Sequence, residues 1–223
     1  MTLSFVGFLA GSAPQASAQV TLKEQKTIIQ ERKKMSSWTR EQVEKNSWKD
    51  AKKMAKQLKK EGWKPMPGSP TLETQMNDVL MRRYEMKGYF PRYILGMGEG
   101  VASTTGVARK QAVARARVEL AGNIGVEVAE LVENSESNIE YSAAEQESIG
   151  KTLASSQSMV QQSLGRTDVT FEAYREKNGS KEVLVYVTCD TKNVKSAILK
   201  AFNEEQKELR DKLENSLNQE SAE

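Results

Sequence analysis

The spacing of apolar positions changes along the chain, and each spacing predicts a different element. Apolar residues three and four apart predict a helix that a capping box at Ser47 and Asp50 would begin and that Gly62 would end. A similar box at Thr21 and Glu24 predicts an earlier helix. A third helix should open at Ser69-Pro70, because the following apolar residues keep helical spacing up to residue 88: Leu72, Met76, Val79 and Leu80.

The spacing shortens to two in YILGMGEGVA, residues 93–102, which predicts a strand. Gly96, Gly98 and Gly100 would then share one face, while Glu99 would lie on the other. The dinucleotide-binding fingerprint needs a further glycine where Val101 stands, and no Gly-Lys-Ser/Thr follows as in a P-loop. We therefore expect a helix over residues 105–123 to pack closely on the bare face through its alanine row, Ala108, Ala112 and Ala116. The alternative, a ligand loop, makes Gly96, Gly98, Glu99 and Gly100 candidate binding residues.

Later patterns complete the expected fold. Residues 125–138 open with alternating valines and are interpreted as a strand, although helical spacing also fits. A capping box at Ser142 and Glu145 predicts a helix that stops at Gly165. Alternating strands around Asn178-Gly179 predict a hairpin that places Cys189 in the core. From Lys192 one long helix is expected, whose charged end would project and could pair with a second copy.

Together these elements predict the α+β class, with a small mixed sheet in βαβ-α-ββ order. Basic helices would precede this domain and a long C-terminal helix would follow it. The predicted divisions are a signal peptide over 1–18, a helical segment over 19–88, the α+β domain over 89–191, and the C-terminal helix and tail over 192–223.

Composition narrows the possible chemistry. The 223-residue chain has no histidine, which excludes Ser-His-Asp and Cys-His catalysis and histidine-ligated zinc. A single cysteine allows neither an intrachain disulfide nor a cysteine metal cluster. No cofactor, metal site or catalytic residue is predicted, and a paired-carboxylate enzyme stays an alternative without a recognisable pair.

Positive charge is concentrated near the N-terminus, where residues 19–64 hold fourteen Lys/Arg against six Asp/Glu. In the expected helix after Ser47, lysines fill the face opposite the apolar stripe. This face could contact an anionic surface, or its lysines could be merely solvated. The candidate contact residues are Lys52, Lys53, Lys56, Lys59 and Lys60.

The first eighteen residues, MTLSFVGFLAGSAPQASA, are apolar and end in an A-x-A cleavage pattern. They predict a secretory signal peptide and no transmembrane span after its removal. The triplet Leu9-Ala10-Gly11 would form a lipobox if cysteine followed, but Ser12 stands there. A lipid anchor is therefore not expected at this position.

GMGEGVAST followed by ARKQAVARARVELAGNIGVEV resembles the glycine-rich strand and the Ala/Arg-rich helix of the twenty-kilodalton envelope lipoprotein family. The same pattern is seen in the N-terminal domain of the flagellar T protein. Residues 58–75 and 164–187 resemble uncharacterised exported proteins of gut bacteria, and the whole resemblance covers most of residues 58–199. It implies a structural domain in the cell envelope and supplies no catalytic residues.

These observations predict a non-enzymatic exported envelope protein, an adaptor or structural component, located in the periplasm or at the cell surface. Its expected partners are envelope proteins or an anionic envelope surface, with a homo-oligomer through the C-terminal helix as a further possibility. Nucleic acid is not expected, because an exported protein seldom meets it. The alternative is a small-ligand-binding periplasmic module that uses the glycine-rich strand.

Overall fold

The computed structural model describes residues 34–35, 37–87, 90–133 and 139–222, and it has the predicted α+β class. Expectations on residues 1–33, the signal peptide and the helix after Thr21 among them, lie outside these residues. The described elements are α2 (Arg40–Lys60), β1 (Lys64–Pro65), α3 (Leu72–Tyr84), β2 (Met86–Lys87), β3 (Phe90–Pro91), β4 (Tyr93–Ala102), α4 (Thr105–Glu133), α5 (Ala143–Ser155), α6 (Gln157–Ser163), β5 (Asp168–Lys177), β6 (Ser180–Asp190), α7 (Thr191–Leu199), the 3-10 helix η1 (Glu204–Gln206) and α8 (Lys207–Ala222).

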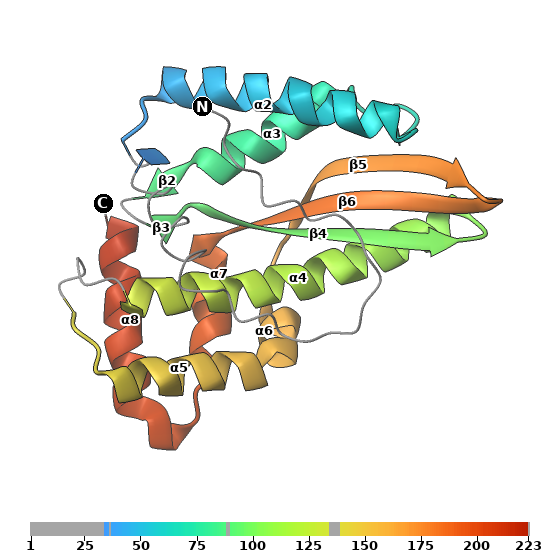
Figure 1. Cartoon of the computed structure of the whole chain (residues 1–223). Helices are drawn as coiled ribbons and strands as arrows, with labels where there is room; N and C mark the ends of the chain where they lie inside the picture. The colour runs from blue at the N-terminus through green and yellow to red at the C-terminus, as the bar shows by residue number, and fades with distance from the viewer. Residues whose placement is uncertain (1–33, 36, 88–89, 134–138, 223) are drawn as a thin grey trace.

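The main described sheet has the strand order β1-β5-β6-β4, and every pairing in it is antiparallel. Helices α2 and α3 lie over one face of this sheet and α4 lies along the other, with α5 and α6 packed beyond α4 and with α7 next to β6, followed by α8 (Figure 1). The hairpin of β5 and β6 turns at Asn178 and Gly179, whose φ angles of 51° and 76° suit a two-residue turn with positive φ. The predicted hairpin is therefore confirmed.

The close packing of α4 on the glycine strand is also confirmed. A Cβ atom added at Gly96, Gly98 or Gly100 would come closer than 3.0 Å to the backbone of α4. Four helical residues rise about 6.0 Å and two strand residues about 6.8 Å, so an alanine of α4 meets each glycine in turn. Ala108, Ala112 and Ala116 are fully buried in this contact.

The interpretation of residues 125–138 as a strand was wrong, because α4 continues to Glu133, and residues 134–138 lie outside the described part. The deciding residue is Val126, which is 37% exposed while Val128 is fully buried, so the side chains follow a helical and not an alternating pattern. Without that strand no βαβ unit forms. The described sheet is therefore antiparallel where a mixed one was expected.

The C-terminal segment is not one projecting helix. The chain bends after α7, passes through η1 and returns as α8, which packs into the domain. Leu213 is fully buried and Leu217 is 6% exposed, and both belong to the core on the α4 side of the sheet. The buried pair Tyr141 and Ser216, whose hydroxyl oxygens lie 2.7 Å apart, fixes α8 further. The apolar stripe expected to pair with a second copy is thus covered by its own chain.

Two predicted helix starts were also displaced. Helix α2 begins after Thr39, whose hydroxyl accepts from Gln42 N–H in a capping box, and α3 begins after Thr71, not Ser69. Ser47 is buried inside α2 instead, and its hydroxyl donates to Asn77 Oδ1 of α3 at 2.9 Å. Gly62, with φ of +87°, follows the end of α2 as predicted.

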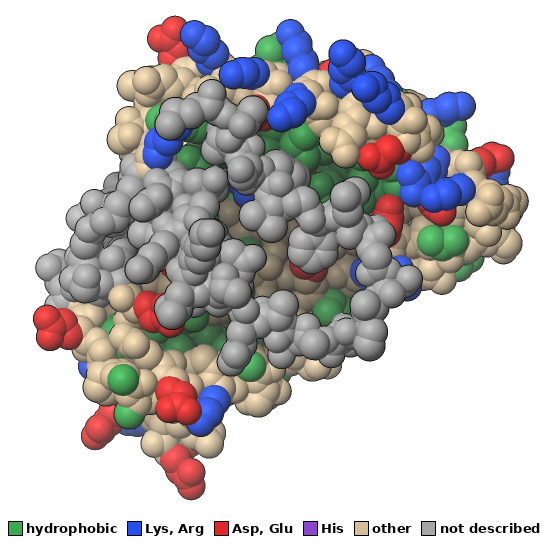
Figure 2. Space-filling view, in the orientation of Figure 1, with side chains coloured by type: hydrophobic (Ala, Val, Ile, Leu, Met, Phe, Trp, Pro, Cys, Tyr) green, Lys and Arg blue, Asp and Glu red, His purple; other side chains and the backbone are tan. Residues whose placement is uncertain are grey.

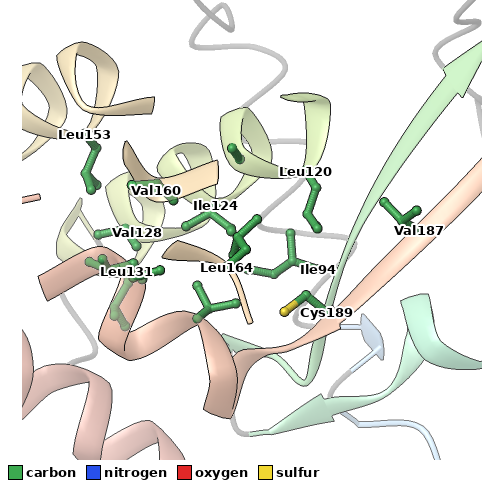
Figure 3. Packing of buried hydrophobic residues seen from close by; sticks show 14 of the residues in the cluster. Ile94, Leu120, Ile124, Val128, Leu131, Leu153, Val160, Leu164, Val187 and Cys189 are labelled. Carbon is green, nitrogen blue, oxygen red and sulfur yellow. The ribbon is translucent and has the colours of Figure 1, made fainter. Parts of the chain in front are cut away.

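Apolar side chains fill both faces of the sheet. On the α4 side, Ile94, Val187 and Cys189 from the strands lie among residues of α4 such as Leu120 and Ile124 (Figure 3). On the other side, the fully buried Phe171 belongs to a second cluster with α2 and α3. The predicted burial of Cys189 is confirmed. The predicted helix from Ser142 is present with its capping box, but it breaks at Ser156 into α5 and α6.

The glycine contact yields a stability prediction. Gly98→Val should lower the free energy of unfolding by about 3 kcal/mol or more, because the side chain would overlap the backbone of α4. Gly150→Ala is the control, because nothing lies within 4 Å of a Cβ at this position in α5, and alanine should stabilise the helix by up to about 1 kcal/mol. Thermal and urea unfolding would measure both changes. An unchanged midpoint for Gly98→Val would contradict the packing.

Candidate functional site

The glycine strand offers no space for a ligand on its glycine face. Helix α4 occupies that face along Gly96, Gly98 and Gly100, and Glu99 points to the opposite side of the sheet. The structure therefore separates the candidate ligand-binding residues that the sequence grouped together. The glycines serve helix packing.

Glu99 lies in a partly buried, charged environment. Burial raises the pKa of the Glu99 carboxyl, Arg175 opposes that rise, and the carboxylates of Glu182 and Glu61 add to it. The Arg175 guanidinium is already engaged, because its Nε lies 2.5 Å from Glu182 Oε2 and its Cζ lies over the Trp63 ring, 4.2 Å from the ring centre. The cluster ties the end of α2 to the hairpin, which is a structural role.

The lysines of α2 form the clearest charged surface. We define the lysine ridge as six exposed residues of this helix: Lys45, Lys49, Lys52, Lys53, Lys56 and Lys60. At 3.6 residues per turn they fall within an arc of about 100° and extend over about 22 Å. The space-filling view shows Lys and Arg side chains gathered along the upper margin, over α2 (Figure 2). Within the described part of the chain, none of the six forms an ion pair.

Contacts with α3 hold the ridge outward. The fully buried Ala51 and Ala55 let the two helices approach closely, and the Tyr84 hydroxyl donates to Asp50 Oδ2 at 2.9 Å. The Ser47–Asn77 hydrogen bond adds a third fixed point. Helix α2 therefore cannot turn its apolar side outward without breaking this interface.

Lys59 differs from the other predicted contact residues. Its Nζ lies 2.5 Å from Glu73 Oε1 at the start of α3, and this ion pair lowers the pKa of the Glu73 carboxyl. Lys59 thus joins α2 to α3. Lys45 and Lys49 extend the ridge toward the N-terminus of the helix. Helical spacing already placed Lys49 on the lysine face, whereas Lys45 was excluded by the predicted start at Ser47 and would have been found once the start at Thr39 was recognised.

A groove between α7 and α8, of about 580 Å³, was not foreseen from the sequence. It is lined by Lys192, Lys195, Ser196, Leu199, Lys200, Phe202, Arg210 and Glu214. Its deeper cations have partners within the chain, because Lys195 lies 2.9 Å from Glu214 and Arg210 lies 3.4 Å from Asp211. This internal pairing compensates much of the positive charge.

Reactive groups are scarce in the described chain. Burial raises the pKa of the Cys189 thiol to about 11, so the thiolate nucleophile is rarely formed at neutral pH. Among the described residues, no group of three or more Cys, Asp or Glu is arranged to hold a metal ion.

Comparison with known proteins adds no assignment. No family model matches the chain, and no curated protein matches it. None of the described helices combines the length and apolar character needed to cross a membrane.

The environment of Glu99 predicts a pH-dependent effect. Because the folded pKa is raised above the ordinary 4.5, ionisation of Glu99 opposes folding as pH rises through that raised value. Glu99→Gln should therefore be more stable than the parent at pH 7, and the difference should disappear below about pH 4. Urea unfolding at a series of pH values measures this.

Glu147→Gln is the control, for which we expect a change in stability at pH 7 of the opposite sign. The Lys151 ammonium, 2.5 Å away, lowers the pKa of the Glu147 carboxyl, so ionisation favours the folded state above pH 4.5. This variant should be slightly less stable than the parent at pH 7. If Glu99→Gln also lost stability at neutral pH, the described environment of Glu99 would be incorrect.

Proposed function

We propose that this protein is a non-enzymatic, exported component of the cell envelope, an adaptor or structural protein that is held at an anionic surface by the lysine ridge of α2. The exposed lysines of that ridge, none of which forms an ion pair with the described residues, are the observation that carries the proposal. Export rests on the apolar segment 1–18 with its A-x-A ending and on the resemblance to envelope lipoproteins. A place in the periplasm or at the cell surface follows from the same two observations.

Charge supports the contact with an anionic surface. Six lysines on one side of a rigid helix would each gain about 1 kcal/mol close to an anionic lipid surface. Salt weakens the attraction beyond a Debye length of about 8 Å. The expected contact is therefore weak, reversible and sensitive to salt.

The packing of α2 determines the kind of contact. An amphipathic helix that inserts into a membrane places its apolar face among the lipids. Here that face is occupied by α3, because Ala51 and Ala55 are fully buried. We therefore propose contact through charge at the surface, without insertion. Anionic lipid headgroups and acidic cell-wall polymers both present the required charge.

The non-enzymatic part rests on the chain's own chemistry. The sequence has no histidine, and its one cysteine is buried with a raised pKa. The resemblance points the same way, since the envelope lipoprotein family implies no catalytic residues. The alternative of a small-ligand module gains no support from the glycine strand, whose glycine face is filled by α4.

Co-sedimentation of the mature protein tests the proposal. At low salt the protein should sediment with vesicles rich in anionic lipid or with purified cell wall, and physiological salt should release it. Replacing Lys49, Lys52, Lys53, Lys56 and Lys60 by glutamine should abolish sedimentation without changing the unfolding midpoint. Lys59 is left unchanged because it pairs with Glu73.

A second variant controls for net charge. It replaces five exposed lysines outside α2 by glutamine: Lys110, Lys177, Lys192, Lys200 and Lys207. Both variants lose five positive charges, but only the first loses ridge lysines, of which it keeps Lys45 alone. An equal loss of sedimentation in both variants would show that net charge, and not the ridge, governs binding. Undiminished binding of the ridge variant would refute the proposed contact.

A further inference from the structure

Strand β4 is an edge strand with the features that favour pairing with another chain. In the described sheet it pairs with β6 alone, in a continuous ladder that runs from Tyr93 opposite Asp190 to Ala102 opposite Lys181 without a bulge. A long regular edge strand exposes backbone N–H and C=O groups to which a further strand can bond. Its outer edge therefore needs protection.

One row of α4 residues lies against this edge. The row consists of Gln111, Arg115, Glu119 and Asn123, spaced four apart along the helix. Gln111 Oε1 accepts from Val101 N–H at 3.2 Å, and the Glu119 carboxylate accepts from the Met97 backbone. Arg115 Nη1 donates to Glu99 O at 2.8 Å, and Asn123 Nδ2 donates to Leu95 O at 2.8 Å.

The chemistry of the row matches the edge group by group. The side-chain acceptors of Gln111 and Glu119 meet backbone N–H groups, while the donors of Arg115 and Asn123 meet backbone carbonyls. The helix advances four residues for each two of the strand, which is the same match that places the alanine row on the glycines. Each of the alternate strand residues 95, 97, 99 and 101 thus has one backbone group bonded to α4.

The opposite edge of the sheet, formed by β1 and β5, is protected against strand addition in a similar way. The short β1, which contains Pro65, covers Ala173 of β5, and a proline has no N–H to offer a further strand. Beside it, Gln75 of α3 accepts from Glu172 N–H at 2.8 Å and donates to Pro70 O at 2.8 Å. Gln75 is 8% exposed, so both hydrogen bonds lie in a largely buried setting.

We infer that the row Gln111, Arg115, Glu119 and Asn123 guards the β4 edge and prevents a second copy of this chain from adding a strand there. The guard is independent of the proposed function, because it involves α4 and β4 and not the lysine ridge. Because the β4 edge is blocked, partners would bind to the helical surfaces.

Replacing all four row residues by alanine tests the guard. Alanine is the best helix former, so α4 should keep its structure while the edge loses its side-chain partners. We expect the parent to sediment as a monomer at all concentrations. The variant should form dimers or larger species as its concentration rises, with a gain in the infrared signal of intermolecular β-sheet. The control carries Lys110→Ala and Glu133→Ala, two exposed α4 positions outside the row, and should behave as the parent.

Amide hydrogen exchange provides the readout if the fourfold variant does not fold. In the parent, the Met97 and Val101 amides should be protected although both lie on the outer edge. Gln111→Ala should reduce protection at Val101 by at least about tenfold and leave Met97 unchanged, and Glu119→Ala should do the reverse. A folded fourfold variant that stays monomeric, a parent that already associates through β4, or single variants without these selective losses would each overturn the inference.

Discussion

The contact between the glycine face of β4 and the alanine row of α4 is the interaction on which the other packing depends. Because Gly96, Gly98 and Gly100 have no side chains, the helix backbone approaches the strand too closely for any Cβ to fit between them. This fixes the direction of α4. The same helix then offers its other sides to α5 and α6, and one of its polar rows to the edge of β4. The sheet face away from α4 is left for α3 and α2.

Elements with strong local signals could be predicted from the sequence. The Asn178-Gly179 hairpin depends on positive φ angles that few residues adopt, and the glycine strand depends on alternate positions without a side chain, so neighbouring residues suffice to identify both. The apolar spacing of residues 125–133 fitted both a strand and a helix. In the fold Val128 is buried and Val126 is exposed, which only the helix allows. Ser47 fits a capping pattern, but it lies inside a longer helix, where its hydroxyl donates to Asn77 of α3. The local pattern alone therefore placed the helix start too late.

The charged surface was predictable from the sequence only as far as local helical spacing determines it. Helical spacing identified Lys52, Lys53, Lys56 and Lys60 as one exposed face, and the structure agrees. Lys59 could not be separated from them, because its partner Glu73 lies on another helix and only the tertiary fold brings the two together. The groove between α7 and α8 was missed because it needs the chain reversal after residue 199, where the apolar spacing continues without interruption.

These contacts place the lysine ridge at the outer side of the molecule. The sheet holds α3, α3 holds α2 through buried alanines and the Ser47–Asn77 hydrogen bond, and the lysines then point away from the domain. We propose that this ridge, and no other surface, meets an anionic surface. Backbone NMR of the mature protein titrated with anionic nanodiscs at low salt tests it most directly. We expect signal changes along α2 that salt reverses, whereas changes centred on the α7–α8 groove, or on none of the helices, would contradict the proposed contact.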